Sequence, residues 1–177
     1  MLNRVRRPDA SEEHDPFARL LNTHRRIEEQ LDALERAAIE IGAPGQQTQA
    51  LVEIDDIIGF FDRAARRHHE DEERSLFPRL RAEPELDPLL EALEAEHRSH
   101  DEAYDRVVAA AQALSPGSLS SDEVERLRAA VVRLAEVYRA HIGREERELF
   151  PRAKTLLGSA ALDAIAAEML YRRGRQR

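Results

Sequence analysis

The sequence of 177 residues contains no cysteine and no tryptophan, and aromatic residues make up only 5% of it. Without cysteine the chain has no disulfide, no thiolate zinc site, no iron–sulfur cluster and no cysteine nucleophile. A metal site in this protein must use histidine and carboxylate ligands, which favours zinc, iron or manganese. No apolar run approaches the roughly 20 residues of a membrane-spanning helix, and residues 1–10 lack the apolar core of a signal peptide. We expect a soluble, cytoplasmic protein that does not bind a membrane.

The charge balance bears on the kind of partner. The chain has 27 Lys and Arg against 35 Asp and Glu, which gives a net charge of -8. Because a phosphate backbone needs a basic surface, nucleic acid is an unfavourable partner. Arginines gather near both ends, and we interpret both ends as solvated, with a flexible N-terminal segment at 1–14 and a basic tail at 173–177.

Turn and capping residues divide residues 15–172, which we expect to form one domain, into long helical segments. We expect helices from Asp15-Pro16 to about 41, at about 48–82 with a bend near Pro78, at 87–114, from Ser120 to about 157, and at 160–172. Since the connections are short, neighbouring helices should run antiparallel. The predicted fold class is all-α, an up-and-down antiparallel four-helix bundle with a short additional C-terminal helix.

A twelve-residue pattern occurs twice in the chain, 73 positions apart, and we call this spacing the repeat offset. Residues 68–79 and 141–152 share eight identities, in the pattern H-x-x-x-E-E-R-x-L-F-P-R. The repeat offset also relates a histidine of the first helix to one of the third. The apolar periodicity of the four helices places four His and two Glu on core-facing stripes. These residues are His24, His68, Glu72, His97, His141 and Glu145.

This arrangement suits a site for two metal ions. A His and a Glu at i and i+4 lie about 5–6 Å apart at their Cβ atoms, so they can bind the same cation. Two Glu that each bridge both ions, with two His on each ion, would form a dinuclear centre with an open position. Burial of so many ionisable groups in an apolar core is costly without a cation. A single core histidine is usually a packed residue, but six positions that obey one offset favour a metal site.

The order H…HxxxE…H…HxxxE, with Leu-Phe-Pro after each HxxxE, resembles the hemerythrin-like (HHE cation-binding) family over about residues 17–157. The resemblance implies two iron ions with a bridging oxo or hydroxo group or carboxylates. It also implies O2, or another small diatomic molecule or peroxide, as the ligand. By position, one iron would be bound by His24 and His68 and the other by His97 and His141, with Glu72 and Glu145 as bridges.

Hemerythrins proper place two His at i and i+4 on the third helix and use an Asp as the last bridge. Here the third helix has His97 and His100, at i and i+3, and the last carboxylate is Glu145. His100 is therefore a candidate for an extra ligand or for a hydrogen-bond donor beside the metal. Tyr104 and Tyr138 share the ligands' stripes, where core packing is the default and a hydrogen bond to a bound molecule is the alternative.

Three residues next to the proposed ligands in the sequence are not expected to bind metal themselves. His69 lies about 100 degrees from His68 on a helical wheel, so we expect it at the surface or in an interface. Pairing of His69 with Glu73 is the alternative register. We expect Glu73 and Glu146 to be solvated or paired with arginine.

The predicted function is binding of O2 or a related small molecule, with no catalytic residue assigned. One alternative is a di-iron oxidoreductase that detoxifies peroxide or nitric oxide. Another is an iron or oxygen sensor that acts through a separate protein partner, which the sequence does not identify. A ferritin-like site would need two E-x-x-H motifs, and Glu94-x-x-His97 is the only one on a predicted core stripe.

Overall fold

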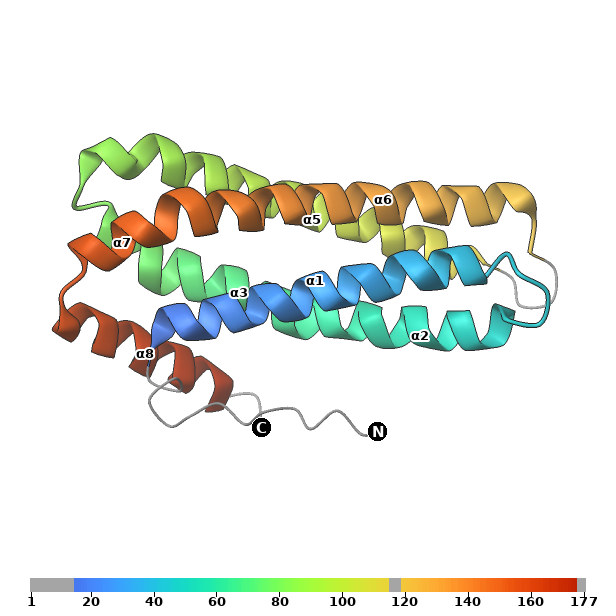
Figure 1. Cartoon of the computed structure of the whole chain (residues 1–177), viewed down its shortest axis with the longest axis horizontal. Coiled ribbons are helices and arrows are strands. Elements are labelled where there is room, and N and C mark those ends of the chain that lie inside the picture. The colour runs from blue at the N-terminus through green and yellow to red at the C-terminus, as the bar shows by residue number, and fades with distance from the viewer. Residues whose placement is uncertain (1–14, 115–118, 175–177) are drawn as a thin grey trace.

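The computed structural model describes residues 15–114 and 119–174, and these form an elongated bundle of helices with no strand among them (Figure 1). The predicted segment 1–14 and the last three residues of the predicted tail lie outside the described residues. The first helix, α1, spans Pro16–Glu40, and the Asp15 side chain accepts a hydrogen bond from the Phe17 N–H at 2.9 Å. The predicted start of this helix is confirmed, because Asp15 is the N-cap and Pro16 stands in the first turn.

The second arm of the bundle is one run of helical turns from Gln47 to Leu80. It consists of α2 (Gln47–Phe60), the π-helical turn η1 (Phe61–Ala65), α3 (Arg66–Asp71), the π-helical turn η2 (Glu72–Leu76) and α4 (Phe77–Leu80). A 3-10 turn, η3 (Pro84–Leu86), leads into the third arm, α5 (Asp87–Gln112). The fourth arm consists of α6 (Ser121–Arg144), the π-helical turn η4 (Glu145–Leu149) and α7 (Phe150–Leu156). A reciprocal capping box between Ser120 and Glu123 begins α6, as predicted.

The C-terminal helix, α8 (Ser159–Gly174), folds back along the start of α1 and lies against η2 (Figure 1). The predicted all-α four-helix bundle with an additional C-terminal helix is confirmed. None of the helices in the described ranges has both the length and the apolar character that a membrane crossing requires.

The turns η2 and η4 are related by the repeat offset, and each begins at a Glu of the repeated motif. In both, the Phe that follows donates its N–H to the carbonyl five residues earlier, from Phe77 to Glu72 and from Phe150 to Glu145. A proline comes next in each motif and lacks the N–H of a regular α-helical turn. A π-helical turn therefore precedes the proline in both copies of the motif.

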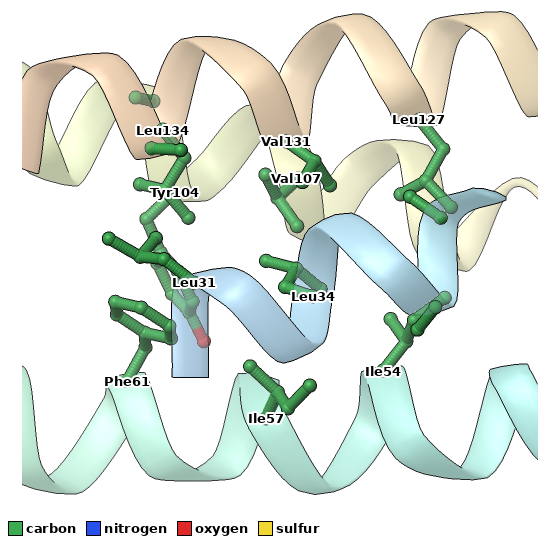
Figure 2. Packing of buried hydrophobic residues seen from close by; sticks show 14 of the residues in the cluster. Leu31, Leu34, Ile54, Ile57, Phe61, Tyr104, Val107, Leu127, Val131 and Leu134 are labelled. Carbon is green, nitrogen blue, oxygen red and sulfur yellow. The ribbon is translucent and has the colours of Figure 1, made fainter. Parts of the chain in front are cut away.

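Two apolar layers fill the bundle and leave a polar layer between them. The larger cluster lies among α1, α2, α5 and α6 and includes Leu34, Ile57 and Val131 (Figure 2). The smaller cluster lies at the end covered by α8 and includes Phe17, Leu90 and Met169. Most of the buried residues between the two clusters carry imidazole or carboxylate groups.

Candidate metal centre

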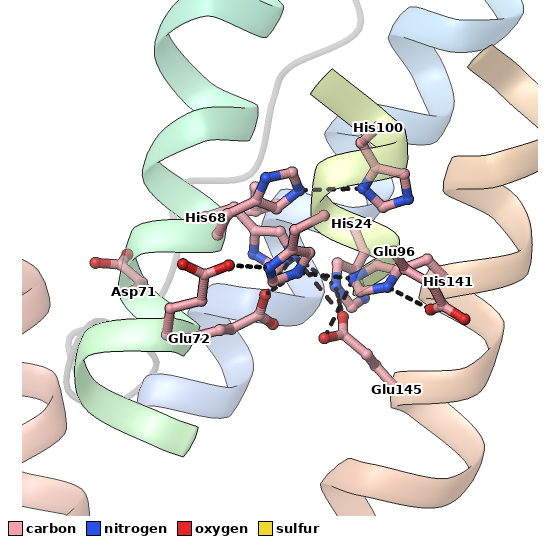
Figure 3. Close-up of polar contacts among 12 residues, drawn as sticks. His24, His68, Asp71, Glu72, Glu96, His100, His141 and Glu145 are labelled. Carbon is pink, nitrogen blue, oxygen red and sulfur yellow. Dashed lines mark hydrogen bonds and ion pairs between the residues drawn. The ribbon is translucent and has the colours of Figure 1, made fainter. Parts of the chain in front are cut away.

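The six residues predicted to bind metal converge in the polar layer between the two apolar clusters (Figure 3). Each is buried, with at most 3% of its surface exposed. They form two groups whose donor atoms lie within 4.8 Å of one another, and each group could hold a metal ion. The first group consists of His24, His68, Glu72 and Glu145, and the second consists of Glu72, His97, His141 and Glu145. Both carboxylates thus belong to both groups.

All four imidazoles turn Nε2 toward the carboxylates. Nε2 lies 3.1 Å from Glu145 in His24, 3.4 Å from Glu72 in His68, 3.5 Å from Glu72 in His97 and 3.3 Å from Glu145 in His141. The Nε2 atoms also face one another in pairs, at 3.0 Å between His24 and His68 and at 3.2 Å between His97 and His141. Four imidazole nitrogens and two carboxylates therefore surround one small volume.

The carboxylates of Glu72 and Glu145 are under-satisfied without a cation. Among the described residues, none of their four oxygens accepts a hydrogen bond of good geometry, although all four are buried. Burial and the neighbouring Glu145 carboxylate raise the pKa of Glu72 well above its usual value. Burial opposes ionisation of Glu145 as well, but the His141 and His24 imidazoles hold its pKa well below the usual value. A bound cation would compensate the buried charge, so this donor set fits a metal.

Three of the four imidazoles are held from outside by a carboxylate on their Nδ1 atom. Glu146 lies 2.9 Å from His24 Nδ1, Glu73 lies 2.7 Å from His97 Nδ1, and Glu96 lies 2.9 Å from His141 Nδ1. An imidazole that donates its Nδ1–H in this way keeps a lone pair on Nε2 for a metal. Among the described residues His68 Nδ1 has no hydrogen-bond partner, although it is buried.

The interpretation of Glu73 and Glu146 as solvated or arginine-paired residues therefore missed the hydrogen bonds that they accept from proposed metal ligands. Both side chains are about two-fifths exposed, but each also accepts a hydrogen bond from a proposed ligand. The hydrogen bond from His97 lowers the pKa of Glu73. The second Glu of each repeated Glu-Glu pair carried a signal for this role, since it is identical in both motifs. Glu96 stands outside the motif and carried no such signal.

Comparison with known proteins agrees with this geometry. Residues 15–153 match the family model of the hemerythrin HHE cation binding domain. The chain belongs to this family. It is also similar to an uncharacterized protein of Haemophilus influenzae (strain ATCC 51907 / DSM 11121 / KW20 / Rd), with 28% identity over 128 residues that cover 71% of this chain and 72% of that protein.

The repeated Leu-Phe-Pro element of this hemerythrin domain packs against the imidazoles. The Phe150 ring stacks on His24, with centroids 5.5 Å apart, and the Phe77 ring stacks on His97 at 6.0 Å. Each aromatic ring thus covers a histidine of the other half. The element is therefore a packing feature that places an aromatic ring against an imidazole in each half.

The expectation that His69 lies at the surface or in an interface is wrong, since only 7% of it is exposed and it packs inside the bundle. Its ring stacks on His97 with centroids 3.9 Å apart, and its Nε2 lies 3.3 Å from Nδ1 of His100. The helical wheel failed here because α3 packs against neighbours on two adjacent faces. His68 meets His24 of α1, and His69 meets His97 of α5.

His100 is fully buried but lies outside both donor groups of the hemerythrin domain. Its Nε2 donates to the Val137 carbonyl at 3.3 Å, so its Nδ1 is the acceptor toward His69. Burial lowers the pKa of His100 to about 2 and lowers the pKa of His69 as well. The repeat offset relates His69 to Ile142 and His100 to Ile27, so this polar pair occurs in one half of the domain only.

The two tyrosines pack in the core, and Tyr138 lies next to this pair. Tyr138 stacks on His100 with ring centroids 4.0 Å apart, and Tyr104 packs against Phe61 at 6.2 Å. The Tyr104 hydroxyl donates to the Ile58 carbonyl at 3.2 Å. Core packing, the default expectation, describes both residues, and a hydrogen bond to a bound molecule stays a prediction.

The helix α8 is joined to the turn that carries Glu72 by a buried ionic contact. Asp71 is buried and accepts hydrogen bonds from Arg172 Nε at 2.7 Å and from Arg173 Nη2 at 2.9 Å. Arg172 also donates to Ser75 Oγ at 2.7 Å. Arg173, which the sequence placed in a solvated tail, thus lies in α8 and contacts the residue directly before Glu72.

Proposed function

We propose that this chain is a non-haem di-iron protein that binds O2 or a related small molecule at its His/Glu centre. The observation that supports this proposal is that Glu72 and Glu145 both belong to each of the two donor groups. Two ions that share both carboxylates form a bridged pair, as distinct from two separate metal sites. His24 and His68 would hold one ion and His97 and His141 the other. We name these the His24/His68 position and the His97/His141 position.

Iron is the metal that fits this proposal best. Imidazole nitrogen and carboxylate oxygen both suit iron, and the family binds cations at such residues. Iron held there supplies one-electron redox steps toward O2, nitric oxide or peroxide. Each position receives four protein donors, which leaves room in the coordination sphere for a small molecule.

The residues of the chain contribute orientation and the exclusion of water. Glu146, Glu73 and Glu96 hold three imidazoles with Nε2 turned inward. Phe77 and Phe150 cover two of the rings, and the apolar clusters close the layer on both sides. A dry site of this kind strengthens the electrostatic interaction of the ligands with the ions and limits loss of a reactive bound molecule to water.

The proposal is tested by loading the purified chain with Fe2+ without oxygen and then admitting air while the visible spectrum is recorded. A new absorption band that appears with O2 and disappears under vacuum supports reversible binding. Oxidation that vacuum does not reverse would favour the oxidoreductase or the sensor alternative. A chain that takes up no Fe2+ would contradict the proposal.

A further inference from the structure

The carboxylates that contact the outer nitrogen, Nδ1, of the proposed ligands are Glu73, Glu96 and Glu146. They hold one pair of equivalent imidazoles in the same way and the other pair in different ways. The repeat offset relates the contact of His97 with Glu73 to the contact of His24 with Glu146. The two Nδ1–oxygen distances are similar, at 2.7 and 2.9 Å. The histidines contributed by α5 and α1 are therefore held in equivalent ways, one at each ion position.

The other two imidazoles, His141 and His68, differ. His141 Nδ1 lies 2.9 Å from Glu96 Oε2, and the other oxygen of Glu96 is held by Arg144 at 2.9 Å. At the positions that the repeat offset makes equivalent to Glu96 and Arg144, the sequence has Thr23 and Asp71.

Neither of these residues replaces the missing carboxylate. The Thr23 hydroxyl donates to the Arg19 carbonyl at 3.1 Å, one turn back in α1. Both oxygens of Asp71 are taken by arginines of α8. His68 Nδ1 is therefore left, within the described part of the chain, as a buried nitrogen without a hydrogen bond.

A carboxylate on the outer nitrogen of a ligand histidine fixes its tautomer and orientation and makes the inner nitrogen more basic. Loss of such a contact typically lowers metal affinity by about 10–100-fold. The two ion positions share Glu72 and Glu145, and each has one imidazole held by Glu73 or Glu146. In the hydrogen bonds that hold their imidazoles, the two positions differ only at the second imidazole, which Glu96 holds at one position and no residue in the described ranges holds at the other.

We infer that the two positions bind a divalent metal ion with unequal affinity, and that Glu96 makes the His97/His141 position the tighter one. Glu96 acts as a positioning residue for His141. The His24/His68 position is the one that loads last and releases its ion first. The inference rests on the proposed function, since it assumes that both positions bind metal.

A simple titration of the wild-type chain does not isolate this difference. Two cations that share both carboxylates repel each other, so the second ion binds more weakly even at identical positions. Each position has to be measured while the other is disabled. The variants His68→Ala and His141→Ala are suited to this purpose, because they remove histidines that the repeat offset makes equivalent. Fe2+ is the probe, titrated without oxygen against a chromogenic chelator.

We expect the His68→Ala chain, which keeps the His97/His141 position intact, to bind its first Fe2+ about 10–100-fold more tightly than the His141→Ala chain. Adding Glu96→Gln to His68→Ala should lower that affinity by about the same factor. Adding Thr23→Glu to His141→Ala should raise the affinity, since the new carboxylate occupies the place equivalent to Glu96. The matched control is Gln30→Glu, which adds the same charge two turns further along α1 and should change nothing.

A second measurement covers the case in which the alanine variants do not fold. In the otherwise wild-type chain, the chelator should remove one ion quickly and one slowly. Thr23→Glu should slow the fast phase, and Glu96→Gln should accelerate the slow phase. Equal first-ion affinities in the two alanine variants, or release rates unchanged by both substitutions, would overturn the inference and leave the proposed function standing. A wild-type chain that binds no Fe2+ would overturn both.

Discussion

Replacement of Asp71 by asparagine tests how firmly α8 is attached to the turn that carries Glu72. Each oxygen of Asp71 accepts one hydrogen bond from an arginine, at 2.7 and 2.9 Å. A hydrogen bond to a charged group contributes about 1.5–3 kcal/mol. Asparagine retains one acceptor, so one of the two bonds is lost and the other is weakened. The arginine side chains are 16% and 28% exposed and regain some hydration, so we expect the free energy of unfolding to fall by about 2 kcal/mol.

The assay is thermal unfolding of the metal-free chain followed by circular dichroism. In a domain of this size 1 kcal/mol corresponds to about 2–4 °C, so Asp71→Asn should lower Tm by about 4–8 °C. Asp163→Asn makes the same substitution at an exposed position of α8 and should change the free energy of unfolding by less than about 0.5 kcal/mol. If Asp71→Asn lowered Tm no more than this control, the buried contact would not be what holds α8 in place.

Three further predictions concern the core, the bridge and the buried histidine pair. Phe77→Ala should lower the free energy of unfolding by about 3–5 kcal/mol in urea denaturation, since the ring is fully buried and stacked on His97. Glu72→Gln should reduce the iron content, measured by elemental analysis, to one ion or none per chain without loss of helical circular dichroism, because an amide is a poor bridge. In the metal-free chain, burial lowers the pKa of His100 in the folded state from 6.5 to about 2. Between these two pH values the unfolded chain binds a proton at His100 and the folded chain does not, so the wild type loses about 1.4 kcal/mol of stability for each pH unit that the pH falls. His100→Gln should lack this loss, and denaturant melts that give parallel pH profiles for the two chains would contradict the prediction.

The helix boundaries and the six converging residues could be predicted because their signals are local or repeated. Capping is decided within a few residues, as the bonds made by Asp15 and Ser120 show. A duplicated hairpin places equivalent positions in equivalent environments, so the repeat offset indicated which residues face the centre. The assignment of each residue to an ion stays a prediction.

Other features could not be predicted because they depend on how the helices pack. The periodicity of one helix indicates a single buried face, whereas α3 lies between α1 and α5 and buries His69 as well. The contact of Glu96 with His141 joins two helices, and the repeat gives no sign of it because the equivalent residue is Thr23. The π-helical turn η2, which precedes Pro78, was missed for a different reason, since a proline indicates a bend without indicating the hydrogen-bond pattern of the turn before it.

The central claim, that two ions share Glu72 and Glu145, is tested most directly by a crystal structure of the iron-loaded chain with an anomalous difference map at the iron edge. We predict two peaks about 3.5–4 Å apart, the separation of bridged two-metal sites. One peak should lie beside His24 and His68, and the other beside His97 and His141, with both carboxylates between them. A single peak, or two peaks that do not share the carboxylates, would contradict the account.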